Sequence, residues 1–296
     1  MPNATAIEIQ ISLQDTCHSY ISGVDTSYGY IPSQAAGIVF TALFAVTTSG
    51  HVAQAAWTRA WWCFLFAIGS IIETLGWAAR IWSAECPYAN TPFLIQIVTL
   101  IIAPTFYTAG LYVLLGSFIK IFGQKSSILT PSLYLWIFCI CDLVSLIVQA
   151  VGGGMAADAT GKVDGDTKPG TNIMVGGIVF QMAAMTAFVV FMVDFLYRVT
   201  KMKVLAATKS TIGPLLAGML TAVVAVYVRS VYRTIELLQG WDGFLITHEP
   251  YFIVLDGTMM VIASVIFNIV HPGWLLPKAL KFSIETEIRD VDRDYG

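Results

Sequence analysis

The sequence contains few charged residues and lacks the common nucleotide-binding and hydrolase motifs. Asp, Glu, Lys and Arg make up 12% of its 296 residues, and 56% are hydrophobic, whereas a soluble domain has roughly 25% charged residues. No P-loop, no G-x-G-x-x-G pattern and no G-x-S-x-G elbow occurs, so no motif supports ATP hydrolysis, dinucleotide binding or serine hydrolysis. The net charge of −3 gives no indication of nucleic-acid binding. The composition excludes a soluble protein and indicates an integral membrane protein.

Patterns that bind metals or cofactors are also scarce. The four histidines and five cysteines form no H-E-x-x-H, H-x-x-x-H or C-x-x-C pattern, and such spacings are typical of zinc sites. We therefore expect no metal and no cofactor. Two less favoured alternatives stay open: His248 and Glu249 beside Asp256 as a hydrolytic or metal site, and His51 with His271 as a metal or haem pair. An enzyme is accordingly the less favoured class.

What the sequence has instead is long apolar runs. A helix needs about 20 apolar residues to cross a bilayer, and seven runs reach that length, at 32–53, 60–82, 92–121, 131–156, 173–198, 212–237 and 250–276. None alternates strictly between apolar and polar residues, as a barrel strand would. The sequence therefore predicts an all-α integral membrane protein, a bundle of seven transmembrane helices. Pro104, inside the third run, indicates a kink.

Lysine and arginine lie mostly on one side of these runs. That side holds eleven of the 16 basic residues, namely Arg59, Lys120, Lys125, Arg198, Lys201, Lys203, Lys209, Lys278, Lys281, Arg289 and Arg293. The other side, which includes the N-terminus, holds Lys162 and Lys168. Because cytosolic loops carry the excess of positive charge, we predict that the N-terminus is outside and the C-terminus is cytosolic.

This orientation divides the chain into three parts. Residues 1–30 form an extracellular N-terminal arm, residues 31–277 the seven-helix transmembrane domain, and residues 278–296 a cytosolic tail. The basic segment 198–209 is where a cytosolic partner would dock.

Two cysteines, Cys17 and Cys86, fall on the predicted outer side, in the arm and in the loop 83–91. An oxidising exterior favours a disulfide between them, which would tie the arm to the bundle. Disulfides require a specific geometry, so the sequence alone leaves the paired and the free states open.

Charged residues also occur at membrane depth, where each costs about 2.5–3.5 kcal/mol to insert. They are Glu73, Arg80, Asp142, Arg229, Arg233, Glu236 and Asp256. At about 100° per residue, Arg229, Arg233 and Glu236 share one face of a helix. Glu73 and Arg80 share a face of another, and Asp142 shares one with Gln149. The helical rise predicts that these residues line the outer half of the bundle, with Asp142 as its floor.

Two pairings follow from this placement. We predict that Glu73 pairs with Arg229 or Arg233 across the bundle, and that Arg233 pairs with Glu236 within one helix. Cations and acids nearly balance, as a buried network requires. Such a network has two interpretations. It either closes on itself and fixes the helix register, or it lines an outward-open cavity with apolar walls that binds an amphiphile.

In the second interpretation the charges have distinct roles. Arg229 and Arg233 would hold an anionic headgroup or poise the glutamates Glu236 and Glu73. The carboxylates of Asp142 and Asp256 would bind an ammonium group.

The chain resembles the RTA-like family of fungal seven-span membrane proteins, often called lipid-translocating exporters. The resemblance covers nearly all seven spans and rests on IIETLGWAAR (71–80), IAPTFYTAGLYVLLG (102–116), CDLVSLIVQAVGGGMA (141–156), GGIVFQ (176–181), RSVYRTIELLQGWDG (229–243), HEPYFIVLD (248–256) and HPG (271–273). It implies a plasma-membrane protein linked to resistance toward toxic amphiphiles and to movement of sphingoid bases or phospholipids. The motif positions carried over are Glu73, Arg80, Asp142, Gln149, Gln181, Arg229, Arg233, Glu236, His248, Glu249 and Asp256.

The expected function is binding and translocation or efflux of an amphiphilic, lipid-like molecule through an outward-facing polar cavity. The ligand would be a sphingoid base, a phospholipid or a toxic amphiphile. A lipid-sensing seven-helix receptor or regulator is the alternative. An intramembrane lipid-modifying enzyme that uses His248, Glu249 and Asp256 is less favoured.

Overall fold

The computed structural model describes residues 12–14, 16–24, 26–160, 162, 165–202, 212–241 and 243–277. Within these ranges the chain consists of helices, turns and loops, without a strand. Seven spans are long and apolar enough to cross a membrane, which confirms the predicted fold class. Six are α2 (Gln34–Thr58), α3 (Phe64–Glu85, preceded by the 3₁₀ turn Trp61–Cys63), α4 (Asn90–Phe122), α5 (Pro131–Thr160), α6 (Lys168–Lys201) and α8 (Ile212–Leu238).

The seventh span, Glu249–Leu275, is built of several pieces. It begins with α9 (Glu249–Phe252), continues as a π-helical segment (Ile253–Thr258), and ends with α10 (Met259–Ile269) and α11 (Pro272–Leu275). A π turn is wider than an α turn and is rare. It rotates the residues within it relative to a continuous α-helix, so helical spacing alone does not give their direction.

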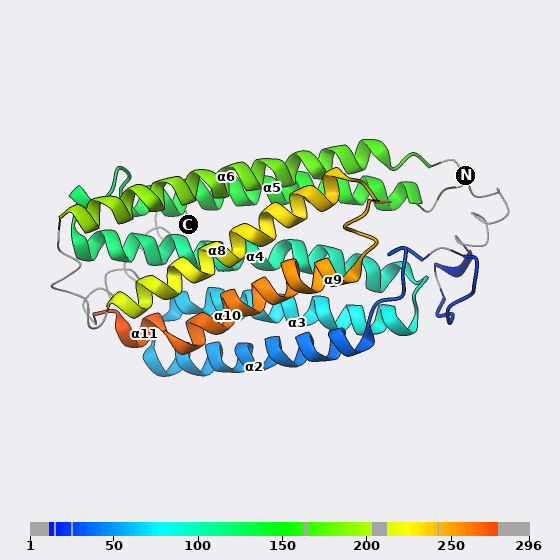
Figure 1. The fold of residues 1–296 in the computed structure, drawn as a ribbon, viewed down its shortest axis with the longest axis horizontal. Helices are drawn as coiled ribbons and strands as arrows, with labels where there is room; N and C mark the ends of the chain where they lie inside the picture. The colour runs from blue at the N-terminus through cyan, green and yellow to red at the C-terminus, as the bar shows by residue number, and fades with distance from the viewer. Residues whose placement is uncertain are drawn as a thin grey trace, which may run out of the picture.

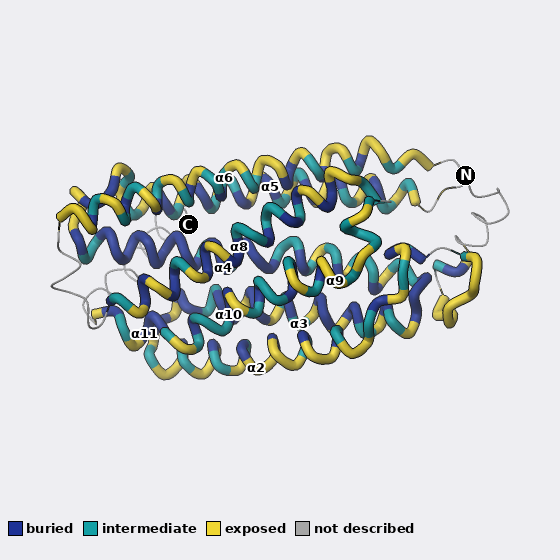
Figure 2. The backbone as a smooth tube through the Cα atoms, in the orientation of Figure 1, coloured by how far each residue is buried: buried dark blue, intermediate teal, exposed yellow. Residues whose placement is uncertain are grey.

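The seven spans run along the length of the molecule (Figure 1), and their contacts close into a ring. Each packs against the next along the chain, and α10 packs against both α8 and α2. The helix α4 also contacts α8 and α10, and its second half is almost entirely buried. Figure 2 shows buried residues along the inner sides of the helices and exposed residues around the outside. Large apolar side chains such as Leu143 and Val190 are exposed on that outer surface, which suits contact with lipid.

Several helices are longer than the apolar runs that predicted them. The run 92–121 becomes Asn90–Phe122, and the run 173–198 becomes Lys168–Lys201. The backbone hydrogen bonds continue past the hydrocarbon region because polar side chains are tolerated at the interface. Residues 203–211 and 278–296 lie outside the described ranges. The docking of a cytosolic partner on 198–209, the cytosolic tail and the membrane orientation therefore stay predictions.

Residues 12–14, 16–24 and 26–33 lie across one end of the bundle, on the right in Figure 1, which we call the arm end. Cys17 is joined to Cys86, just after α3, by a disulfide bond. The Tyr88 hydroxyl lies 3.0 Å from both the backbone nitrogen and the carbonyl oxygen of Ile21. These bonds hold the arm over the ends of α3 and α4.

Candidate functional site

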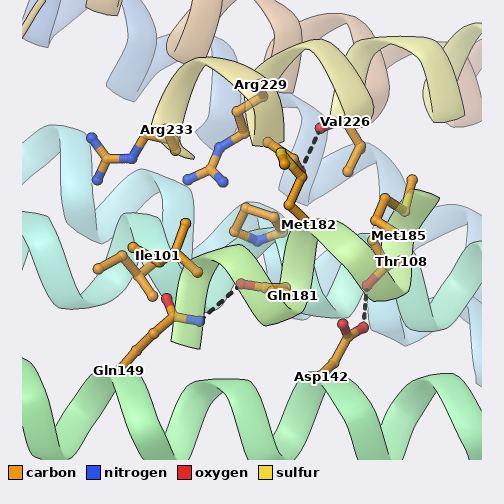
Figure 3. A pocket seen from close by; sticks show the side chains of 13 residues that line it. Ile101, Thr108, Asp142, Gln149, Gln181, Met182, Met185, Val226, Arg229 and Arg233 are labelled. Carbon is orange, nitrogen blue, oxygen red and sulfur yellow. Dashed lines mark hydrogen bonds between the residues drawn. The ribbon is translucent and has the colours of Figure 1, made fainter. Parts of the chain in front are cut away.

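A cavity, here called the inner cavity, lies inside the ring between α4, α5, α6 and α8 (Figure 3). It contains about 500 Å³ of space not filled by atoms, counting its open mouth. Its polar lining is Thr108, Asp142, Gln149, Gln181, Arg229, Ser230 and Arg233, and its apolar lining is Ile101, Pro104, Ile178, Met182, Met185 and Val226. Five residues singled out from the sequence therefore meet at one cavity, although they come from three helices.

Asp142 supplies the carboxylate of the inner cavity on the α5 side. Its Oδ2 accepts hydrogen bonds from Thr108 Oγ1 at 2.9 Å and from the Tyr112 hydroxyl at 3.0 Å. Among the described residues, no hydrogen bond reaches Oδ1 and no cation pairs with this side chain, which is 5% exposed. A carboxylate with one oxygen already fixed and the other open is suited to bind a cationic ligand.

The amides of Gln149 and Gln181 meet across α5 and α6. Gln149 Nε2 donates to Gln181 Oε1 at 3.0 Å, as Figure 3 shows. Gly177 permits this approach, because a Cβ at that position would lie 2.8 Å from Gln149 Cγ and 3.0 Å from a carbonyl oxygen of α5. Each amide keeps further donor or acceptor capacity, so the pair can also bind hydroxyl groups of a ligand.

Arg229 compensates a break in the hydrogen-bond ladder of α4. Pro104 lies inside α4 and has no N–H, so the carbonyl of Leu100, four residues earlier, has no helical donor. Arg229 Nη2 donates to that carbonyl. An unsatisfied backbone group in a bilayer costs several kcal/mol. Pro104 and Arg229 therefore form a structural unit, although they lie on different helices.

The same guanidinium is paired with Asp256. Arg229 Nε lies 2.9 Å from Asp256 Oδ1, and the two side chains are 7% and 0% exposed. Asp256 lies within the π-helical segment, and such segments are frequent at functional sites. The next residue, Gly257, packs so closely on α3 that a Cβ would lie 2.5 Å from the Trp77 ring. The π-helical segment therefore brings Asp256 close to both α3 and α8.

The predicted pair between Arg233 and Glu236 is confirmed. Arg233 Nη1 lies 2.6 Å from Glu236 Oε2, and Glu236 Oε1 accepts a hydrogen bond from the Tyr232 hydroxyl at 2.8 Å. Arg233 Nε also lies 3.8 Å from Asp256 Oδ1. Both arginines of this helix face are thus neutralised by acids of the chain. The arrangement favours neither their predicted role toward an anionic headgroup nor the predicted ammonium binding by Asp256.

The prediction that Glu73 pairs with Arg229 or Arg233 is wrong. Asp256 and Glu236 are the acids that these arginines contact. Glu73 is completely buried, and neither of its carboxyl oxygens has a hydrogen-bond partner. Helical spacing correctly indicates that Glu73 faces the interior. It does not indicate which acid approaches the arginines, because that depends on the π-helical segment of the seventh span.

A second cavity, the arm-end cavity, lies beneath the arm. It contains about 480 Å³ of space not filled by atoms, again counting its mouth. Its lining is Ser27, Tyr28, Tyr30, Arg80, Phe93, Gln96, Ile97, Ile101, Met174, Arg233, Glu236, Leu237, Trp241, Ile246 and Phe252. Ile101 and Arg233 line both cavities. The two cavities are therefore neighbours, separated by these two side chains.

Arg80 is held firmly at the arm-end cavity. Its Nη2 lies 2.8 Å from Glu249 Oε1 and donates to the Tyr30 hydroxyl at 2.7 Å, and its guanidinium carbon lies 4.6 Å from the centre of the Phe252 ring. The Tyr28 hydroxyl lies 2.8 Å from both Ser83 Oγ and Gln96 Oε1. Arg80 thus anchors the arm to the seventh span.

Tyr28 is buried and Tyr30 is partly buried, and this changes the acidity of both side chains. Burial raises the pKa of Tyr28 to about 12 and also raises the pKa of Tyr30. Both hydroxyls therefore remain protonated at physiological pH and can donate hydrogen bonds at the cavity.

Sequence reasoning missed several polar residues at these sites, among them Thr108 and Tyr112, which bond Asp142, and the arm tyrosines Tyr28 and Tyr30. Thr108 and Tyr112 carry a usable signal, since they lie at i and i+4 and so on one face of α4. Tyr28 and Tyr30 carry none, because their positions depend on the fold of the arm.

The alternative site of His248, Glu249 and Asp256 does not form a shared site. His248 is exposed, and its Nδ1 lies 2.7 Å from the carbonyl oxygen of Phe244. Glu249 pairs with Arg80, and Asp256 pairs with an arginine of α8. In the part of the chain that the structure describes, no group of three His, Cys, Asp or Glu residues could hold a metal ion. The residues of the proposed hydrolytic or metal site therefore belong to separate networks.

Comparison with known proteins gives a family and several relatives. The model of the family described as RTA1 like protein matches residues 66–279. The sphingoid long-chain base transporter RSB1 of Saccharomyces cerevisiae (strain YJM789) is 32% identical over 299 residues, covering 89% of this chain and 78% of that protein. Protein RTM1 of Saccharomyces cerevisiae is 28% identical, covering 81% of this chain and 89% of that protein. No solved structure matches the chain.

Proposed function

The chain belongs to the family of RTA1-like proteins, and on that premise we propose that it binds and transports a long-chain base. Such a ligand has an ammonium headgroup with hydroxyl groups and a long alkyl chain. A relative that matches most of this chain is named a sphingoid long-chain base transporter. The observation that carries the proposal is the inner cavity, where one unpaired carboxylate, that of Asp142, lies among amides and apolar side chains.

Asp142 binds the ammonium group through Oδ1. Its Oδ2 is already fixed by Thr108 and Tyr112, so the carboxylate does not need to reorient when the ligand arrives. The arginines at the same cavity are neutralised by Asp256 and Glu236. Asp142, the acid at the inner cavity without a cationic partner among the described residues, therefore attracts a cation, and an anionic headgroup is the less favoured ligand.

The rest of the ligand matches the other lining residues. The hydroxyl groups of the base bind the amides of Gln149 and Gln181, which keep free hydrogen-bonding capacity. The alkyl chain lies along the apolar side chains of α6 and α8, among them Met182, Met185 and Val226. Flexible methionines adapt to chains of different length.

The path of transport runs from the inner cavity to the arm-end cavity. The two share Ile101 and Arg233, so a change in these side chains would join them. We propose that the arm end faces the outside of the plasma membrane. The distribution of lysine and arginine supports this orientation, as does the disulfide between Cys17 and Cys86 at that end, since disulfides persist in oxidising surroundings.

The test is flux of a fluorescent long-chain amino-diol from proteoliposomes to an acceptor in the medium. We expect Asp142→Asn to lower the flux or the affinity about 10- to 100-fold, because a hydrogen bond to a charged group contributes about 1.5–3 kcal/mol and 1.4 kcal/mol corresponds to a factor of ten. Asp158→Asn is the matched control, since Asp158 lies on the same helix with its side chain 72% exposed.

A second ligand tests the chemistry rather than the residue. A long-chain diol without the amine should not depend on Asp142. Unchanged amine transport in a folded Asp142→Asn variant, or equal dependence of both ligands on Asp142, would refute the proposal.

A further inference from the structure

Glu73 is a buried acid that the proposed transport path does not use. It lies in the middle of α3 with no exposed surface, and both of its carboxyl oxygens lack a hydrogen-bond partner. It lines neither of the two cavities described above. An ionised carboxylate in an apolar interior is very unfavourable unless it is paired and hydrogen-bonded. The environment of Glu73 therefore requires a positive charge that the chain does not provide.

The charges around Glu73 identify this requirement more closely. The central cluster contains the cations Arg229 and Arg233 and the acids Asp256, Glu236 and Glu73. Arg229 pairs with Asp256, and Arg233 pairs with Glu236. With all three acids ionised, the cluster would carry one uncompensated negative charge, and that charge would be on Glu73. One bound proton makes the cluster neutral.

The other elements packed around Glu73 supply no further cation. From α4 the nearest titratable group is Tyr107, which bonds Ser70, and from the seventh span it is Asp256. On α2 the titratable residue is His51, whose ring nitrogen lies 3.3 Å from Asn268. On α3 itself, Arg80 is occupied by Glu249. Among the described residues, Arg229 and Arg233 are the cations that interact with Glu73, and both are already paired.

We propose that Glu73 is a proton-binding site and that it couples transport of the base to exchange of a proton. This inference rests on the proposed function. Glu73 differs from Asp142, which borders the inner cavity with an open oxygen and has two hydroxyl donors. Asp142 borders a cavity that a ligand can enter, whereas Glu73 has no exposed surface and borders neither cavity.

The exchange conserves charge. When the ammonium of the base binds at Asp142, it adds a positive charge beside Arg229, which borders the inner cavity. The Glu73 carboxylic acid then releases its proton to the solvent when its buried site opens during transport, and the Arg229 guanidinium shifts from Asp256 toward the new carboxylate. Asp256 keeps Arg233, whose Nε is 3.8 Å away. Release of the base and return of a proton to Glu73 restore the first arrangement. By linkage, base binding and proton binding oppose each other equally.

Flux in proteoliposomes with and without a transmembrane pH gradient tests the coupling. The probe is the fluorescent long-chain amino-diol. In the wild type, we expect the pH gradient to change the rate of probe export from the vesicles at least about threefold relative to vesicles without a gradient. The flux that remains in Glu73→Gln should not respond to the gradient, since glutamine imitates the protonated acid and cannot release a proton. Glu85→Gln, on an exposed position of the same helix, should behave as the wild type. Wild-type flux that ignores the gradient would overturn the coupling while leaving the transport function standing.

An infrared measurement tests the proton site without transport. The carbonyl stretching band of a protonated carboxylic acid, compared in H₂O and D₂O, should be present in the wild type and reduced in Glu73→Gln. If Glu73→Gln does not fold, Glu73→Asp keeps a carboxylic acid and should shift the band in frequency. A band that neither variant alters overturns the proposal. Absence of all wild-type flux would count against the proposed function, and the infrared result would still decide whether Glu73 holds a proton.

Discussion

Pro104 leaves the Leu100 carbonyl without a helical donor, and Arg229 supplies the missing hydrogen bond. The free-energy cost of replacing Arg229 should therefore depend on which residue stands at position 104. In the wild-type background, Arg229→Met removes the donor to the Leu100 carbonyl and the partner of Asp256. The unsatisfied carbonyl costs about 1–3 kcal/mol and the unpaired buried acid about 3–5 kcal/mol. In a Pro104→Ala background, the N–H at position 104 can bond the Leu100 carbonyl within α4. The first cost then disappears and the second remains.

A double-mutant cycle isolates this difference. We expect Arg229→Met to destabilise the Pro104→Ala protein by about 1–3 kcal/mol less than it destabilises the wild type. The assay is equilibrium unfolding in mixed micelles by increasing dodecyl sulfate, followed by tryptophan fluorescence and circular dichroism. Arg233→Met is the matched control, because Arg233 bonds Glu236 rather than α4, and its effect should add to that of Pro104→Ala. A coupling below about 0.5 kcal/mol between Pro104→Ala and Arg229→Met would refute the reasoning.

Three further predictions concern packing, the arm and pH. Gly152→Ala should destabilise the protein by about 1–3 kcal/mol, because the new Cβ would lie 2.3 Å from a backbone nitrogen of α6. Gly154→Ala is the control and should leave the stability unchanged, because a Cβ there would have no heavy atom within 4 Å. Comparing the unfolding midpoints of the two variants tests the difference. Replacing Cys17 and Cys86 together by serine should lower the free energy of unfolding by about 2–5 kcal/mol, measured against the oxidised wild type. Burial raises the pKa of Tyr28 to about 12 from an ordinary value of 10.0. The folded protein therefore keeps the full contribution of Tyr28 to its stability below pH 10 and loses it as the pH rises through about 12. The difference in unfolding free energy between the wild type and Tyr28→Phe should shrink over that range, and a constant difference would contradict the assignment.

The seven spans could be predicted from the sequence because lipid imposes a strict requirement. A backbone in hydrocarbon must satisfy its hydrogen bonds internally, so a long apolar run has little choice but to form a helix. The pair between Arg233 and Glu236 was predictable for a similar reason, since both residues lie on one helix whose geometry is fixed. Local geometry thus accounts for what the sequence predicts correctly.

The errors arise where two helices meet. The acid paired with Arg229 is Asp256 rather than Glu73, and the reason is a π-helical segment that no hydrophobic pattern indicates. The sequence predicts a kink at Pro104. It does not predict that Arg229 bonds the carbonyl left open by Pro104, because that contact depends on how α8 packs against α4. The contacts of the arm depend on a segment that folds back over the ends of α3 and α4 and is tied there by the disulfide between Cys17 and Cys86.

The closed ring has a consequence for the order in which the protein is made. The span that packs between α8 and α2 and supplies Asp256 leaves the ribosome after the six spans that precede it. A nascent chain that ends after α8 therefore holds Arg229 in the membrane without its counter-ion, and its ring is open to lipid. The seventh span completes both the wall and the charge balance in a single step.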